Sequence, residues 1–136
     1  MRINAPFIIA IFAATSGPVQ NQPMKIAQVR RYALSLPDAT EEPHFEYSSF
    51  RIRGKIFVTV PPDEEHIHIF VGEDEREQAL ALHPAFLEKL VWGGKVRGLR
   101  VRLSKASPLV VNQLVRAAWV RKAPKRLIAA LMEPTP

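Results

Sequence analysis

The chain lacks cysteine, and none of its apolar runs approaches the roughly 20 residues that span a bilayer. Without cysteine it can form no disulfide and no Cys-ligated metal site, and it has no thiol nucleophile. An apolar fraction of 47% with 24% charged residues is typical of a globular protein, and 136 residues suit one domain with a real core. We therefore expect a cytoplasmic protein with no membrane span.

Carboxylates are scarce in the second part of the chain. Residues 1–85 carry 8 Lys and Arg against 11 Asp and Glu, a net charge of −3, whereas residues 86–136 carry 11 against 2, a net charge of +9. A positive face attracts phosphate-bearing polymers, anionic lipids and acidic proteins alike. This asymmetry predicts an anionic partner.

The first 23 residues differ from the rest, with one charge, an apolar stretch over 7–14, and then Ser, Gly, Pro, Asn and Gln. A signal peptide is one interpretation, but Arg2 alone makes a weak basic start and the apolar stretch is minimal. We favour a disordered or misassigned N-terminal extension over 1–23, followed by a single domain over 24–136.

Hydrophobic periodicity predicts the order of the elements. Apolar residues at helical spacing predict helices over 25–36 and 109–122, acidic residues in a first turn predict one over 73–83, and a proline start predicts those over 84–92 and 125–131. Segments rich in Phe, Ile, Val and Thr, or alternating Leu and Val with Arg, predict four strands, over 45–53, 55–60, 66–71 and 99–104. An acidic, proline-broken stretch over 38–44 precedes the first strand. This order predicts an α+β two-layer sandwich, with an antiparallel sheet of about four to five strands and helices packed on one face.

Two stretches carry a resemblance to a known family. One is "ALSLPDATEEPHFEYSSFRIRGKIFVTV", which joins Leu-Pro to Phe-x-(Ile/Val)-x-Gly-Lys-x-Phe, and the other is "AAWVRKAPKRL". Over roughly residues 25–131 the chain resembles the MmcQ/YjbR-like family of small bacterial proteins. The resemblance implies a compact fold related to the frataxin-like sandwich and a DNA-binding role, and it implies no catalytic residues. The basic 86–136 part is unsuited to the iron binding that frataxins perform with acidic side chains.

Arginines alternate with apolar residues in two predicted strands. Strand alternation places Arg51 with Arg53, and Arg100 with Arg102. A two-residue turn at Gly54-Lys55 and a three-residue loop both fit the hairpin. We prefer the loop, because it keeps on one face the apolar residues Phe50, Ile52, Ile56, Val58 and Val60.

If the apolar residues face the helices, the opposite sheet face gathers the four arginines with His66, His68 and Phe70. Cations beside flat rings are what a nucleic-acid surface uses. The alternative interpretation is that half-exposed strands simply alternate apolar and charged residues, and that arginine protects sheet edges from aggregation.

A second basic group, "RKAPKR", lies where two predicted helices meet. Two of its cations fall in the first turn of the last helix, where the helix dipole disfavours them, which indicates an anion site. The predicted nucleic-acid interface is therefore Arg51, Arg53, Lys55, Arg100, Arg102, Lys125 and Arg126.

The sequence contains no motif that indicates a metal site or an enzyme active site. His66 and His68 share a predicted strand face, but no third ligand has motif spacing, so we expect no metal and no cofactor. The chain has no nucleophile elbow, P-loop or dinucleotide fingerprint, and its carboxylates cluster in solvated runs. We assign no catalytic residue, although missing motifs do not exclude catalysis.

We expect a non-enzymatic protein, a monomer or weak homodimer, that binds DNA with low sequence specificity. Two alternatives stay open: a small-molecule or anion binder of unknown ligand, with a cleft between sheet and C-terminal helix, and a protein–protein adaptor. One contiguous basic surface favours DNA binding, a buried concave site favours the small ligand, and an exposed apolar patch favours the adaptor.

Overall fold

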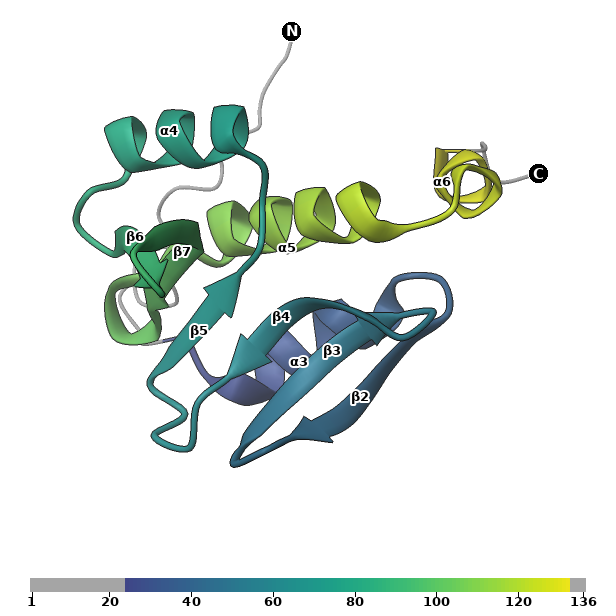
Figure 1. The fold of residues 1–136 in the computed structure, drawn as a ribbon, viewed down its shortest axis with the longest axis horizontal. Helices are drawn as coiled ribbons and strands as arrows, with labels where there is room; N and C mark the ends of the chain where they lie inside the picture. Colours follow the sequence, from purple (N-terminus) through teal and green to yellow (C-terminus); the bar gives the residue numbers. More distant parts are fainter. Residues whose placement is uncertain (1–23, 133–136) are drawn as a thin grey trace, which may run out of the picture.

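A six-stranded antiparallel sheet with four α-helices packed against it makes up the described part of the chain, residues 24–132 of a computed structural model (Figure 1). The strand order is β2-β3-β4-β5-β7-β6, so β7 lies between β5 and β6. This confirms the predicted α+β sandwich, with one strand more than the upper end of the expected range. The extension predicted over 1–23 lies outside the described residues.

The elements follow one another in chain order. They are α3 (Ile26–Ser35), β2 (Ala39–His44), β3 (Tyr47–Ile52), β4 (Lys55–Val60), β5 (His66–Ile69), α4 (Glu73–Leu82), β6 (Leu87–Trp92), β7 (Lys95–Arg102), the 3-10 turn η1 (Leu103–Lys105), α5 (Pro108–Lys122) and α6 (Lys125–Met132). Four of the five predicted helices and all four predicted strands are among them. Ser107 caps α5, its Oγ accepting from the Val110 N–H at 3.5 Å.

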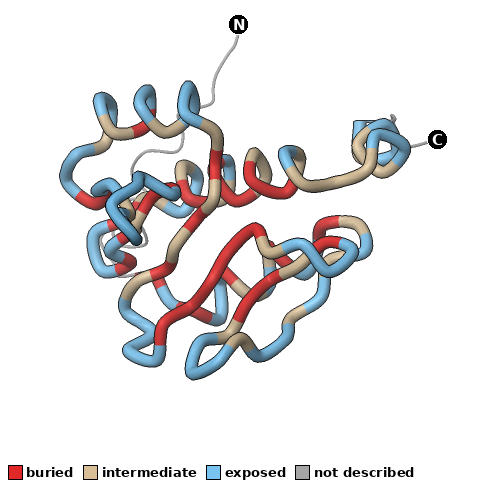
Figure 2. The backbone as a smooth tube through the Cα atoms, viewed as in Figure 1, coloured by how far each residue is buried: buried red, intermediate tan, exposed pale blue. Residues whose placement is uncertain are grey.

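The hydrophobic core lies between the sheet and the helical layer. In Figure 1, α3 lies behind the central strands, and α5 runs along the sheet with α4 on its far side. Figure 2 shows buried backbone concentrated in β3, β4 and one side of α5. Trp119, Phe50 and Phe57 are the largest fully buried side chains of the described residues. One apolar cluster therefore joins the helices to the sheet.

Two local predictions are wrong because strand pairing overrides local sequence preference. The predicted helix over 84–92 is strand β6, which pairs with β7 through a two-residue turn at Gly93 and Gly94, both at positive φ. The stretch 38–44, read as a break, contains strand β2, an edge strand in which Pro43 is tolerated. Both errors fall on the outermost strands of the sheet.

The β3–β4 hairpin adopts neither of the two registers considered. Ile52 lies opposite Lys55, so the turn is Arg53-Gly54, with φ of 52° and 81°. A bulge then leaves Phe57 unpaired between Ile56, which lies opposite Arg51, and Val58. Phe57 therefore takes the place that we expected for Ile56 in the core.

Candidate nucleic-acid interface

All six strands contribute one polar residue each to a row across the sheet. The register places these residues opposite one another in the order Glu42, Ser49, Thr59, His68, Arg100 and Glu88. From Ser49 to Glu88, each has a buried apolar neighbour next to it in its own strand, so the row lies on the sheet face turned away from the core. We call this face, with the residues two positions along each strand, the outer sheet face.

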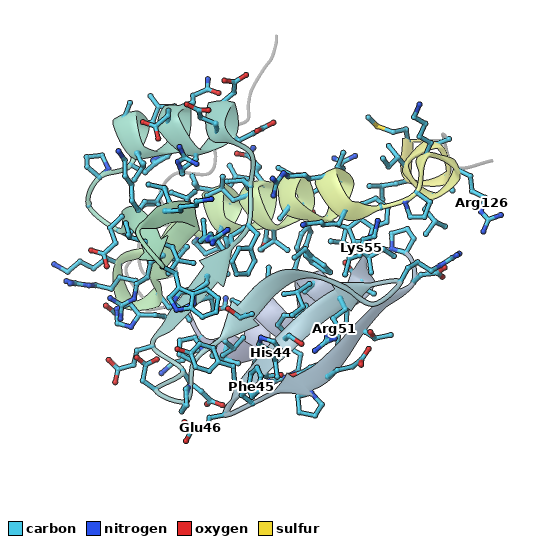
Figure 3. The ribbon with its side chains drawn as sticks, in the orientation of Figure 1. His44, Phe45, Glu46, Arg51, Lys55 and Arg126 are labelled. Carbon is cyan, nitrogen blue, oxygen red and sulfur yellow. The ribbon has the colours of Figure 1, made fainter. Side chains whose placement is uncertain are left out.

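Three predicted interface arginines lie on the outer sheet face. Arg100 belongs to the polar row, and Arg102 follows two positions later, opposite His66. Arg51 lies two positions from Ser49 and donates from Nε to its Oγ at 2.9 Å; Figure 3 shows Arg51 in front of the sheet. Three strand spacings separate β3 from β7, and Arg51 lies two positions along β3 from Ser49, which is in line with Arg100, so the backbones of Arg51 and Arg100 lie roughly 16 Å apart. The arginines therefore occupy two separate places on this face, and Ser49 and Thr59 of the polar row are buried.

Arg53 does not belong to this group. It lies in the turn between β3 and β4, and its Nη2 pairs with Asp38 Oδ2 at 2.9 Å. Both side chains are about half exposed, at 46% and 50%. The expected partnership of Arg51 and Arg53 on one strand face is thus absent, because β3 ends at Ile52 and Arg53 is the first residue of the turn.

The other predicted cations gather at the junction of α5 and α6. The pKa of Lys122 is lowered by partial burial and by the nearby charges of Arg121 and Lys55, which places Lys55 near the end of α5. Lys125 and Arg126 are exposed in the first turn of α6. Figure 3 shows Lys55 below the end of α5 and Arg126 pointing outward from α6. We call Lys55, Lys122, Lys125 and Arg126 the junction cluster; it is separate from the outer sheet face.

His68, in the centre of the polar row, favours its neutral form. The pKa of His68 is lowered, first by burial and then by the nearby charges of Arg100 and His66, so its neutral form is favoured. Its Nδ1 lies 3.2 Å from Thr59 Oγ1. The positive charge of Arg100 is partly offset by Glu88, because Arg100 Nη1 lies 3.0 Å from Glu88 Oε2.

Two aromatic side chains are exposed at hairpin tips. Phe45, in the β2–β3 turn, is 92% exposed, and Trp92, in the β6–β7 hairpin, is 75% exposed. Figure 3 shows Phe45 beside His44 and Glu46 at the end of its hairpin. Sequence reasoning missed Trp92 as a surface residue because it assigned a helix there; the following Gly-Gly pair was the hairpin signal.

Comparison with known proteins identifies the family. The YjbR family model matches residues 34–121. The chain belongs to the YjbR family. The crystal structure of the Deinococcus radiodurans protein DR2400, from the domain family DUF419, is similar at a TM-score of 0.65 and 17% sequence identity, over 84% of this chain and 93% of that one. At this identity the likeness shows the fold alone. The comparison with curated proteins found no match.

A hollow of about 410 Å³ in this YjbR-family chain has mainly carboxylates among its charged lining residues, in contrast to the arginines of the outer sheet face. It is lined by residues of α3, the β2–β3 hairpin and the β4–β5 loop, not by the C-terminal helices. Arg30 at its edge donates to both carboxylate oxygens of Glu41, at 2.8 and 3.1 Å, and this contact lowers the pKa of Glu41. The remaining charged lining residues are the carboxylates Glu42, Glu46 and Glu64, which oppose phosphate binding.

Within residues 24–132, the YjbR fold brings no three His, Asp or Glu side chains together as metal ligands. Across the same residues, no helix is long and apolar enough to cross a membrane. An exposed apolar group does occur on the β6–β7 hairpin, where Val91, Trp92 and Val96 are 58%, 75% and 37% exposed.

Proposed function

We propose that the chain binds nucleic acid without catalysis, and that the outer sheet face is its main contact surface. One observation carries the proposal: cross-strand register places Arg100 and Arg102 on one face, opposite His68 and His66. Arginine contacts to phosphate supply affinity without reading sequence, so low base specificity follows.

The junction cluster is the second contact in this proposal. Lys55 lies close enough to Lys122 to lower its pKa, and no ion pair within residues 24–132 involves either of them. A phosphate group supplies the counter-charge that this cluster otherwise takes from solvent ions. The exposed rings of Phe45 and Trp92 are also available for base stacking.

Fluorescence anisotropy with labelled duplex and single-stranded DNA over a salt series tests the proposal. We expect binding that weakens linearly with log salt concentration. The double variant Arg51→Ala with Arg100→Ala should bind more weakly and lose a slope of about two, close to one for each phosphate contact removed.

The matched control is Lys25→Ala with Arg31→Ala, which removes two exposed cations at the first helix, in the layer opposite the outer sheet face. It should keep nearly the wild-type affinity. Absence of binding at low salt, or an equal effect of both double variants, contradicts the proposal. Lys125→Ala with Arg126→Ala then tests the junction cluster, and its slope change should add to that of the outer sheet face if one strand contacts both.

A further inference from the structure

A hollow of about 140 Å³ lies at one end of the outer sheet face. The backbone segment 84–87, which joins α4 to β6, forms one wall, and Arg102 N–H donates to the Phe86 carbonyl at 2.9 Å. The remaining lining residues are His66, Glu88, Arg100 and Arg102. The hollow is thus bounded by backbone on one side and by cationic side chains on the other.

The two arginines of this hollow differ in their partners. Arg100 Nη1 contacts Glu88 Oε2 at 3.0 Å, and the two side chains are 39% and 62% exposed. Arg102 is exposed and takes part in no ion pair within residues 24–132. His66 Nδ1 contacts Asp63 Oδ2 at 3.1 Å, which orients the ring at the edge of the hollow. The Arg100 guanidinium is therefore paired with a carboxylate, and the Arg102 guanidinium is available to bind an anion.

The volume and the charge of the hollow indicate which class of ligand it can bind. The volume equals that of about five waters in the liquid, which suits one phosphate group better than a nucleotide. Alternate residues of a strand lie about 7 Å apart, so the forks of Arg100 and Arg102 can converge on one oxyanion. Two guanidinium groups match a dianion, and Glu88 is the competing anion.

We infer that this hollow binds a phosphate monoester, and that the Glu88 carboxylate holds Arg100 in its place while the site is free. A monoester carries nearly two negative charges near neutral pH and ends a chain, whereas the diester of a strand interior carries one and continues on both sides. A wall formed by 84–87 suits a group that ends there. A terminal phosphate of a nucleic-acid strand as the source rests on the proposed function; a free nucleotide or inorganic phosphate does not.

Single-stranded DNA oligonucleotides of one sequence, with and without a 5′-phosphate, test the inference by fluorescence anisotropy. We expect the phosphorylated strand to bind at least about tenfold more tightly, as charge-assisted hydrogen bonds imply. Arg102→Gln should abolish this preference, and Glu88→Gln should increase it, because the competing carboxylate is gone. The matched control is Glu77→Gln, which removes the exposed partner of Arg76 at 2.9 Å and should leave the preference unchanged.

Titrations with thymidine 5′-monophosphate and with inorganic phosphate, followed by the NMR shifts of the His66 and Arg102 amides, distinguish the phosphate monoester site from the proposed nucleic-acid binding. Saturable shifts without oligonucleotide binding support the monoester site and overturn the proposed function. Equal binding of the two oligonucleotides, with no shifts from either small phosphate, overturns the monoester site and leaves the proposed function standing. Unchanged preference in Glu88→Gln contradicts the role of Glu88 as competitor.

Discussion

The indole Nε1 of Trp119 donates a hydrogen bond of 3.1 Å to the carbonyl oxygen of Pro37, 82 residues earlier in the chain. Trp119 is fully buried in α5, and Pro37 lies in the loop between α3 and β2. This bond joins the long helix to the chain segment that leads into the edge of the sheet. It satisfies the polar N–H of a buried indole ring.

Trp119→Phe should lower the free energy of unfolding by about 1 to 3 kcal/mol, because the Pro37 carbonyl loses its partner and part of the ring volume is left empty. Urea unfolding followed by circular dichroism measures the change. Trp92→Phe is the matched control at an exposed position and should stay within about 0.5 kcal/mol of wild type. Equal small effects at both positions would show that the Pro37 bond contributes nothing.

Gly98→Ala should also destabilise the fold. A Cβ at this position meets the Ile69 carbonyl and lies 3.2 Å from Phe70 Cα, both backbone groups that cannot move aside cheaply. Overpacking of this kind costs about 1 to 3 kcal/mol. At Gly72 the added Cβ meets only the ends of the flexible side chains of Glu75 and Arg121, so Gly72→Ala should cost less. Thermal unfolding of the two variants checks the order, and a reversed order contradicts the close approach at Gly98.

His68 predicts a dependence of stability on pH. Its pKa is lowered in the folded chain by burial and by Arg100 and His66, whereas in the unfolded chain it stays near the usual 6.5. The unfolded state therefore binds more protons as pH falls through 6.5. The stabilising contribution is complete above that value and is lost below it, toward the folded pKa.

Urea midpoints measured at about pH 7.5 and about pH 5.5 compare stability on the two sides of pH 6.5, and both pH values lie above the range in which Glu41 titrates, because its pKa is lowered from 4.5. His68→Gln should flatten the difference between the two midpoints. His44→Gln leaves His68 in place and should retain the wild-type difference. If His68→Gln has the same pH dependence as wild type, the assignment to His68 is wrong.

Phe45→Asn should stabilise the chain by about 1 kcal/mol. Phe45 has a φ of 58° in the β2–β3 turn and is 92% exposed, so it bears the cost of a left-handed conformation and buries almost no surface. Asn tolerates this conformation, whereas Phe45→Ala keeps the strain and should give no gain. Differential scanning calorimetry compares the three chains. A loss of stability in Phe45→Asn would mean that the edge-to-face contact of Phe45 with His44, at 4.9 Å, matters more than the strain.

Local signals explain what the sequence predicted of the fold. Ser107 and Pro108 mark the start of α5, and acidic residues in the first turn mark α4, because caps and dipoles act within one helical turn. Strands β2 and β6 were missed because each is specified by a single neighbour across a hairpin. Such pairing depends on contacts that local sequence preference does not contain.

The candidate site was predicted in the same partial way. Period-two alternation was enough to place Arg51, Arg100 and Arg102 on one face. Arg53 was misplaced because its positive φ belongs to a turn type that the Arg-Gly pair does not signal as strongly as Asn-Gly. The bulge at Phe57 and the partnership of Arg100 with Glu88 required the register, which only the folded sheet reveals.

The strand order also sets a sequence of events for a chain that emerges from the ribosome from its N-terminus. Strands β2, β3 and β4 can pair with one another once Val60 has emerged from the ribosome, because each neighbours the next. Strand β6 has no partner until β7 follows it, and β7 must then enter between β6 and β5. The Met24 N–H also lacks its partner until this stage, because it donates to the Leu103 carbonyl at 3.1 Å. Until residue 103 is made, a nascent chain therefore holds a half-sheet whose open edge is β5, the stage at which it is most exposed to misassociation.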